Sequence, residues 1–224
     1  MKGRCEMLPF TSYDNLIANV QETLNRADLA AAVPGFIALV EGDVNADDRF
    51  RVLPSLKRST ATLPPPTPPA TESYIPMPAD YICMQNFHLI QTPPPNRLEL
   101  LTTTQADEMR LILPEQDLPQ FFVVTGEEFE LLPAPDISYQ AQMTYFANVP
   151  PLSTSNETNW LLQRWPNVYY YGALRHSAPY LKDDARIAVW NEFYNQIAEN
   201  IHISSDRGQF SGQTMKMRVL KRYR

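Results

Sequence analysis

Cysteine, histidine and glycine are scarce in this chain of 224 residues. The two cysteines, Cys5 and Cys83, lie far apart and form no CxxC pattern, so we expect two thiols and neither a disulfide framework nor a zinc site. The three histidines (His88, His176 and His202) have no metal-ligand spacing, and none of the seven glycines forms a phosphate-cradling loop. We therefore expect no cofactor and no enzyme.

Long apolar runs are missing as well. No run approaches the roughly 20 residues of a membrane span, and the N-terminus lacks the apolar core of a signal peptide. We expect a protein made in the cytosol, without a membrane partner. Hydrophobic residues make up 44% of the chain, which is enough for a core in one domain or in a domain with a large insertion.

The net charge of -6 is unevenly distributed. The last ten residues contain five basic side chains and no acid, whereas residues 1–214 contain 14 basic against 25 acidic side chains, or -11. An acidic body is a poor nucleic-acid binder at long range. A short basic arm suits an acidic protein surface or a phosphate backbone.

The clearest structural pattern lies between residues 137 and 203. Apolar and polar residues alternate from Ile137 to Tyr145, which predicts a half-buried strand. A helix should begin near Asn159, and Pro166 should restart or kink it before Pro179 ends the segment. The next helix should start near residues 182–184. Its apolar stripe consists of Ile187, Trp190, Tyr194, Ile197 and Ile201.

Two helices are predicted near the N-terminus. Residues 11–14 have the form of a cap before a helix that ends near Asn25, and Pro34 opens a second helix. Its apolar face contains Phe36, Ile37, Val40 and Val44. The acids Glu41, Asp43, Asp47 and Asp48 are interpreted as a solvated face, with a metal or partner site as the alternative.

Between residues 54 and 95 the chain contains eleven prolines, which predicts an extended connector; a ligand for a proline-recognising domain is the alternative. Short apolar runs, separated by turn signals, predict strands at 81–90, 98–102, 120–124, 128–132 and 137–147. Residues 125–127 fit a tight hairpin. These strands indicate an antiparallel β domain inserted between two pairs of helices.

Several segments resemble those of tailed-bacteriophage head-to-tail adaptor (head-completion or connector) proteins. They are Asn-Val-Pro-Pro-Leu-Ser (148–153), Asn-Trp-Leu-Leu (159–162), Tyr-Gly-Ala-Leu (171–174), Ala-Pro-Tyr-Leu-Lys-Asp-Asp (178–184) and Phe-Ser-Gly (210–212). The resemblance covers roughly residues 12–212 in order and spacing, and it is weakest at 54–95. It implies a virion protein that forms a ring, expected to be twelvefold, below the portal protein and joins the head to a tail or nozzle protein. DNA would pass through its channel without sequence-specific binding.

The predicted fold is α+β: a four-helix bundle-like α domain, an inserted antiparallel β domain and an extended C-terminal arm. Residues 1–53 form the N-terminal helical pair, 54–150 the connector and β domain, 151–207 the C-terminal helical pair and 208–224 the basic arm. Gly208 to Gly212 should break the last helix. Rival hypotheses are a carbohydrate-binding or other tail-associated binding module, which would show a row of exposed rings on one sheet, and an enzyme.

Two sets of residues are candidate contact sites. Three consecutive tyrosines on a helix point in three directions, so at least one of Tyr169, Tyr170 and Tyr171 should meet a neighbouring subunit; a contact with the β domain is the alternative. The C-terminal arm partly alternates apolar and basic residues, as a strand added to another chain would. A frayed terminus and a DNA contact are its alternatives. Within the resemblance the arm should dock on the portal through Phe210, Met215, Lys216, Met217, Arg218, Val219, Leu220, Lys221, Arg222, Tyr223 and Arg224.

Overall fold

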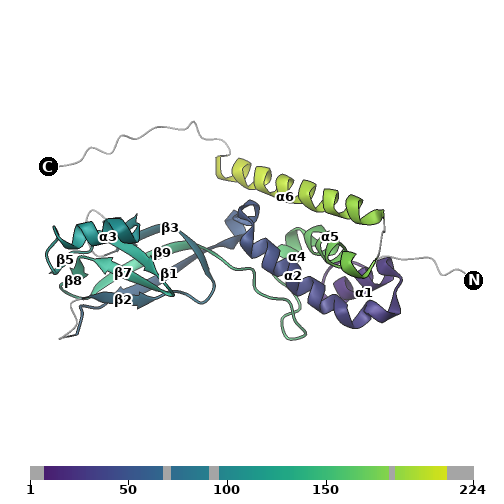
Figure 1. The fold of residues 1–224 in the computed structure, drawn as a ribbon, viewed down its shortest axis with the longest axis horizontal. Helices are drawn as coiled ribbons and strands as arrows, with labels where there is room; N and C mark the ends of the chain where they lie inside the picture. Colours follow the sequence, from purple (N-terminus) through teal and green to yellow (C-terminus); the bar gives the residue numbers. More distant parts are fainter. Residues whose placement is uncertain (1–7, 68–71, 91–95, 182–184, 211–224) are drawn as a thin grey trace, which may run out of the picture. The chain divides into compact units, whose positions relative to one another are not determined.

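The computed structural model describes residues 8–67, 72–90, 96–181 and 185–210 (Figure 1). These residues form six α-helices and several mainly antiparallel sheets, which confirms the α+β class. Two compact units are present. The helical unit contains the described residues up to Pro54 and from Val149 onward, and the β unit spans Ser55–Asn148.

The helical unit contains five of the α-helices and four short 3-10 helices. The α-helices are α1 (Tyr13–Leu24), α2 (Val33–Ala46), α4 (Trp160–Arg164), α5 (Pro166–His176) and α6 (Arg186–Phe210). The 3-10 helices are η1 (Ala27–Ala32), η2 (Asp48–Phe50), η3 (Leu53–Ser55, at the junction with the β unit) and η4 (Ala178–Tyr180).

The ends of these helices follow the local sequence. Ser12 caps the start of α1, because its side chain accepts a hydrogen bond from the Asn15 backbone N–H. The cap is thus one residue later than the first residue of the predicted cap, 11–14. Asn25 ends α1 in the left-handed conformation. Asn159 caps α4, and Pro166 is the first residue of α5, as predicted. The predicted break spans Gly208 to Gly212; α6 continues through Gly208 and has its last described residue, Phe210, within this segment.

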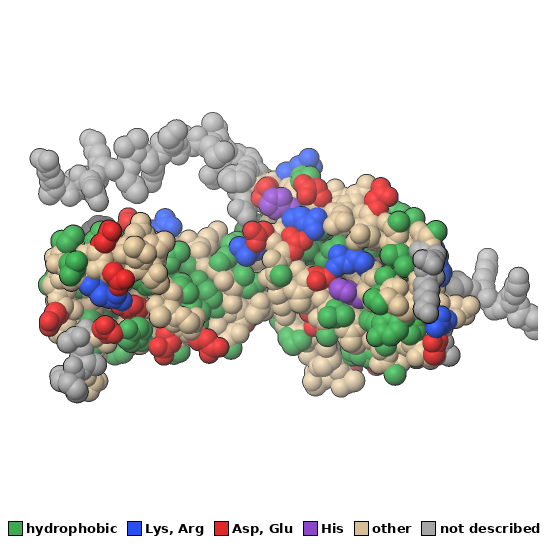
Figure 2. Space-filling view, viewed as in Figure 1, with side chains coloured by type: hydrophobic (Ala, Val, Ile, Leu, Met, Phe, Trp, Pro, Cys, Tyr) green, Lys and Arg blue, Asp and Glu red, His purple; other side chains and the backbone are tan. Residues whose placement is uncertain are grey.

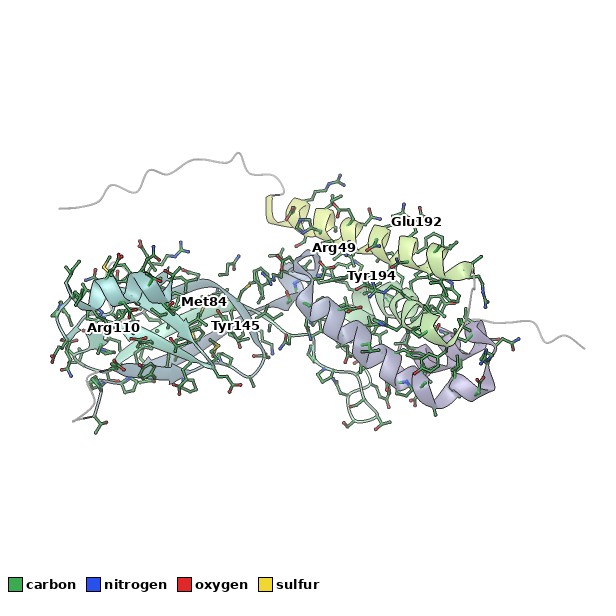
Figure 3. The ribbon with its side chains drawn as sticks, in the orientation of Figure 1. Arg49, Met84, Arg110, Tyr145, Glu192 and Tyr194 are labelled. Atoms are coloured by element: carbon green, nitrogen blue, oxygen red, sulfur yellow. The ribbon has the colours of Figure 1, made fainter. Side chains whose placement is uncertain are left out.

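Helix α5 is the centre of the helical unit and packs against α1, α2, α4 and α6. Figure 1 shows α6 lying alongside α5. The predicted apolar stripe of α6 faces this core: Trp190, Tyr194 and Ile201 are buried, and Ile187 and Ile197 are partly buried. In Figure 3, Tyr194 points from α6 toward α5, whereas Glu192 lies on the opposite side of α6. The helical spacing of the apolar residues, which repeats every 3.6 residues, therefore correctly predicted the side of α6 that packs in the core.

One segment of the helical unit has the length and composition of a membrane span, contrary to the sequence-based expectation. It runs from Asp28 to Ala46, with a mean hydropathy of 1.3, and comprises most of η1 and all of α2. Its apolar side chains belong to the core of the helical unit: Leu29, Val33, Phe36, Ile37, Val40 and Val44 are all buried there. The apolar residues that give this segment its high mean hydropathy are thus the ones that pack in the core of the helical unit.

The described residues of the β unit form nine strands and helix α3 (Thr103–Arg110). Its strands are β1 (Leu56–Leu63), β2 (Ser73–Pro76), β3 (Tyr81–Leu89), β4 (Glu99–Leu101), β5 (Gln116–Asp117), β6 (Phe121–Thr125), β7 (Glu128–Leu132), β8 (Ala134–Pro135) and β9 (Tyr139–Ala147). They form a three-stranded sheet in the order β1-β9-β3, a four-stranded sheet in the order β2-β7-β6-β4, and the pair β5-β8.

The two larger sheets are joined through the residues just before β4. The Leu98 backbone N–H donates to the Phe87 carbonyl, and the Leu89 N–H donates to the Asn96 carbonyl, both at 2.8 Å. This segment thus pairs with β3 before the chain enters the other sheet as β4. The joined sheets enclose a second core, in which Phe87, Phe122 and Phe129 contact one another edge to face or tilted.

Strand β9 confirms the predicted alternation, because every second residue from Tyr139 to Ala147 is buried. Ile137, two residues earlier, is 58% exposed, so the strand begins later than predicted. The predicted hairpin also forms between β6 and β7. Thr125 pairs with Glu128, and Gly126 adopts a φ of 62° in the two-residue turn, a conformation that favours glycine.

Two predictions for the β unit are wrong, and one helix was not predicted. The proline-rich stretch is more than a connector, because β1 and β2 form between its prolines as edge strands, where proline is tolerated. The sheets are not purely antiparallel, since β4 pairs parallel with β6, and β5 with β8. Helix α3 was missed although Thr102 and Gln105 form a capping box.

Candidate functional site

The predicted portal-binding arm is barely covered by the structure. Its residues 215–224 lie outside the described residues, and Phe210 is the last residue of α6. The predicted subunit contact, by contrast, lies on α5, where all three tyrosines are described.

Tyr169 is fully buried and belongs to a polar network inside the helical unit. Its hydroxyl donates to Glu41 Oε1 at 3.1 Å and accepts a hydrogen bond from Asn159 Nδ2 at 2.7 Å. Asn159 also caps α4, because its Oδ1 accepts from the Leu162 backbone N–H at 2.8 Å. Tyr169 therefore joins α2, α5 and the start of α4 and has no surface for a neighbouring subunit.

Glu41 is the centre of this network. It is 7% exposed, and its Oε1 also accepts the Leu152 backbone N–H at 2.7 Å. The prediction that Glu41 lies on a solvated face is wrong, because it follows Ile37 by four residues and so lies on the apolar side of α2. Burial raises the pKa of Glu41, against the opposing effect of the Leu152 and Tyr169 hydrogen bonds. Burial and the Glu41 carboxylate likewise raise the pKa of Tyr169.

The same network fixes the loop that follows the β unit. The Val149 backbone N–H donates to Asn45 Oδ1 at 2.9 Å, and Asn159 Nδ2 donates to the Pro150 carbonyl at 2.8 Å. Asn156 Nδ2 donates to the Pro151 carbonyl at 2.7 Å. Side-chain amides thus satisfy the backbone carbonyl groups of Pro150 and Pro151. The segments 148–153 and 159–162 thus meet through these contacts.

A series of aromatic rings leads from this core to the surface of the helical unit. Phe10 contacts Tyr170, Tyr170 contacts Tyr171, and Tyr171 contacts Phe193 of α6, with ring centroids 5.4, 5.2 and 5.1 Å apart. Tyr170 is buried, and its hydroxyl lies 2.6 Å from Thr23 Oγ1. Tyr171 is partly buried, and Phe193 is 41% exposed. Tyr171 is thus the least buried of the three tyrosines.

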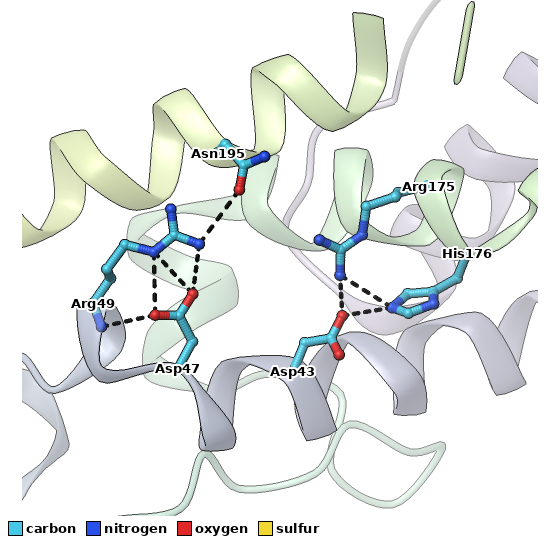
Figure 4. A network of polar contacts seen from close by, with 6 residues as sticks. All are labelled: Asp43, Asp47, Arg49, Arg175, His176 and Asn195. Carbon is cyan, nitrogen blue, oxygen red and sulfur yellow. Dashed lines mark hydrogen bonds and ion pairs between the residues drawn. The ribbon is translucent and has the colours of Figure 1, made fainter. Parts of the chain in front are cut away.

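Charged side chains hold α2, α5 and α6 together on another side (Figure 4). Asp43 contacts Arg175, and His176 Nε2 lies 2.7 Å from Asp43 Oδ2. Asp47 forms an ion pair with Arg49 at 2.6 Å, and Arg49 reaches Asn195 Oδ1 of α6 at 3.4 Å. These acids of α2 are therefore bound to cations of the same unit rather than only solvated.

A small pocket of about 170 Å³ lies in the β unit. Arg110 Nε donates to Glu130 Oε1 at 3.1 Å, and the Glu130 side chain is 3% exposed. Tyr74 donates to Glu72 at 2.5 Å, which raises the pKa of Tyr74 to about 12. The pocket is lined by Glu72, Arg110, Leu113, Pro114, Glu115, Glu130, Leu131, Leu132, Pro133 and Ala134. No local sequence pattern marks this pocket, because its residues come from four separate stretches.

The described residues contain no group of three or more His, Cys, Asp or Glu side chains able to hold a metal ion. His88 lies beside Asn86 on β3, His176 pairs with Asp43, and His202 lies 3.7 Å from Asp206 on α6. The predicted start of the last helix, residues 182–184, lies outside the described residues.

The polar groups of the helical unit thus bind helices and a loop to one another. A model of the SU10 adaptor protein family matches residues 11–218. The chain therefore belongs to this family of phage head-to-tail adaptor proteins, which gives it a structural role in the virion at the head-tail junction. No curated protein matches the chain.

Proposed function

We propose that twelve copies of the chain form a ring below the portal protein, which extends the DNA channel and provides the docking surface for a tail or nozzle protein. DNA passes through this channel without sequence-specific contacts. The chain is made in the host cytoplasm and binds the portal after genome packaging. Family membership over residues 11–218 is the observation that carries this proposal.

In this proposal the helical pairs 1–53 and 151–207 form a four-helix bundle-like domain, with residues 54–150 inserted. Residues 208–224 extend as a basic arm that docks on the portal. Its five basic side chains suit an acidic surface, and its apolar residues can enter pockets of the portal.

The proposed contact between neighbouring copies lies at the exposed end of the aromatic series. Val189 and Phe193 are one turn apart on α6 and are 46% and 41% exposed. Phe193 lies against Tyr171, so the three side chains form one apolar patch. Aromatic residues are enriched where proteins meet, because they bury a large area at a small cost in side-chain entropy. We call Tyr171, Val189 and Phe193 the α6 patch.

The alternative of a carbohydrate-binding module has less support. Among the described residues of the β unit, Tyr74 is the one aromatic side chain in the set of exposed large hydrophobics. A flat row of rings that could stack on a sugar is therefore not formed by these residues.

Mass photometry of the purified chain, alone and with portal rings, tests the proposal. Full-length protein and a version truncated after Gly212 are compared. We expect the full-length chain to load the portal with a fixed stoichiometry and the truncated chain to lose this loading. If the full-length chain does not bind the portal, the adaptor function is wrong. If the truncated chain loads as well as the full-length chain, the role of the arm is wrong.

A further inference from the structure

The outer face of the sheet β1-β9-β3 differs in charge from the rest of the β unit. Residues 55–148 contain four basic and eleven acidic side chains, a net charge of -7. Figure 2 shows acidic side chains scattered over the visible face of this unit. The rows of side chains that cross the outer face of the sheet, in contrast, contain no carboxylate.

The register of the strands defines two of these rows. The first runs from Thr60 through Gln142 and His88 to Arg97, across β1, β9, β3 and the segment before β4. The second runs from Arg58 through Thr144 to Asn86. Thr62 and Gln140 continue the surface, with Gln140 Nε2 donating to Thr62 Oγ1 at 2.9 Å. We call these residues the outer sheet face.

The side chains of this face are polar and at least partly exposed. Residues of β9 alternate between buried positions and the partly buried Gln140, Gln142 and Thr144. Gln85, Asn86, His88 and Arg97 line an open hollow of about 420 Å³. Along the chain, the nearest carboxylate to Arg97 is that of Glu99, two residues later.

Two arginines provide the positive charge of the outer sheet face. Of the four basic side chains in the β unit, Lys57 pairs with Asp80, and Arg110 pairs with Asp107 and Glu130. Arg58 and Arg97 form no ion pair with any described residue. The two arginines of this acidic unit that form no ion pair with a described residue thus both lie on the outer sheet face, whose two rows lack acids.

We propose that the outer sheet face contacts the phosphate backbone of DNA. This inference rests on the proposed function, which brings DNA into the channel of the ring, and it names the surface of each subunit that faces the DNA. Phosphate oxygens are bound in proteins by arginine and by the amides and hydroxyls of Asn, Gln, Ser and Thr, and these are the groups present here. The contact carries no sequence information, because it does not reach base edges.

The geometry favours a weak contact repeated around a ring over tight binding by one subunit. Three strand spacings of about 4.8 Å place Arg58 and Arg97 roughly 15 Å apart, so each can reach a different phosphate. Two phosphate contacts predict that a fourfold rise in salt lowers the affinity about tenfold. Such a contact can hold the DNA in the channel and still let it slide.

The test uses the full-length chain labelled with ¹⁵N and a short DNA duplex in low salt. We expect the backbone signals of β1, β3 and β9 to shift on DNA addition and the shifts to decline with salt. Arg58→Gln combined with Arg97→Gln should abolish them. Lys57→Gln is the matched control, because it removes one charge from the same strand on the opposite face, and it should leave the shifts unchanged.

Three outcomes would overturn the inference: no shift of these signals in low salt, shifts confined to the C-terminal arm or the helical unit, or equal shifts with polyglutamate, which would indicate an acidic protein partner. Portal loading of the same samples is measured in parallel by mass photometry. A chain that loads the portal but shows no DNA shift on the outer sheet face contradicts only this inference. A chain that does not load the portal contradicts the proposed function.

Discussion

Gly172 of α5 lies directly against Val40 of α2. A methyl group added at Gly172 would stand 2.7 Å from Val40 Cγ2, 2.9 Å from Val40 Cγ1 and 3.3 Å from Tyr194 Cε2 of α6. Real side chains do not approach this closely, so the glycine sets the spacing of three helices. This gives a physical reason for the glycine in the segment Tyr-Gly-Ala-Leu.

Gly172→Ala should therefore destabilise the protein by about 1–3 kcal/mol, because Val40 and Tyr194 must move in a packed core. Gly42→Ala is the control. Gly42 lies inside α2 with no atom within 4 Å of an added methyl group, so alanine there should stabilise by roughly 0.5–1 kcal/mol. Urea unfolding of both variants measures the two changes. An equal effect of the two substitutions would contradict the close packing at Gly172.

Local patterns were sufficient to predict the main helices of the helical unit. Asn25, Asn159 and Pro166 mark helix ends through the chemistry of one or two residues, and the stripe of α6 follows from its period. Strand β9 and the turn at Gly126 are local in the same sense. These features depend on neighbours within about ten residues, and the sequence displays them directly.

Apart from the missed helix α3, whose capping box is local, the errors involve partners that are distant in the sequence. Strand β1 pairs with β9, which lies more than 70 residues later in the sequence. The prolines close to β1 predicted a connector, because this distant partner is not visible in the local sequence. Glu41 is buried because Leu152 and Tyr169 donate to it from distant segments. Its position one helical turn after Ile37 was the available clue. The outer sheet face was missed for the same reason, because strand register brings Arg58 and Arg97 onto one surface.

Glu41→Gln should change the pH dependence of stability. Burial raises the pKa of Glu41 in the folded protein above its value of about 4.3 in an unfolded chain. The folded state then holds the proton more tightly, so the stabilising effect is fully present below the unfolded pKa and is lost as the pH rises through the folded pKa. The wild type should therefore lose stability relative to Glu41→Gln as the pH rises from about 4.3 through the raised pKa of the folded state.

Denaturant unfolding at a series of pH values measures this difference. Glu192→Gln is the control for the chemical change, because Glu192 lies on the exposed side of α6. Parallel stability curves for the wild type and Glu41→Gln across this range would show that the Glu41 carboxyl titrates alike in the folded and unfolded states.

The three consecutive tyrosines should respond differently to loss of the hydroxyl. Tyr169→Phe removes the donor to Glu41 and the acceptor of Asn159, both in a buried site, and should destabilise by about 1–3 kcal/mol. Tyr171→Phe changes a partly exposed side chain and should stay within about 0.5 kcal/mol of the wild type. Thermal unfolding of both variants measures the two changes in stability. A harmless Tyr169→Phe would mean that its hydroxyl does not bind Glu41.

Trp190 and Phe193, one turn apart on α6, should separate folding from assembly. Trp190 is 6% exposed and packs in the core, so Trp190→Ala should cost about 3–5 kcal/mol of stability. Phe193 is 41% exposed and belongs to the α6 patch, so Phe193→Ala should cost less than about 1 kcal/mol. If neighbouring copies meet at this patch, Phe193→Ala should lower the number of copies on each portal ring in mass photometry. Full loading by a folded Phe193→Ala chain would show that the copies meet elsewhere.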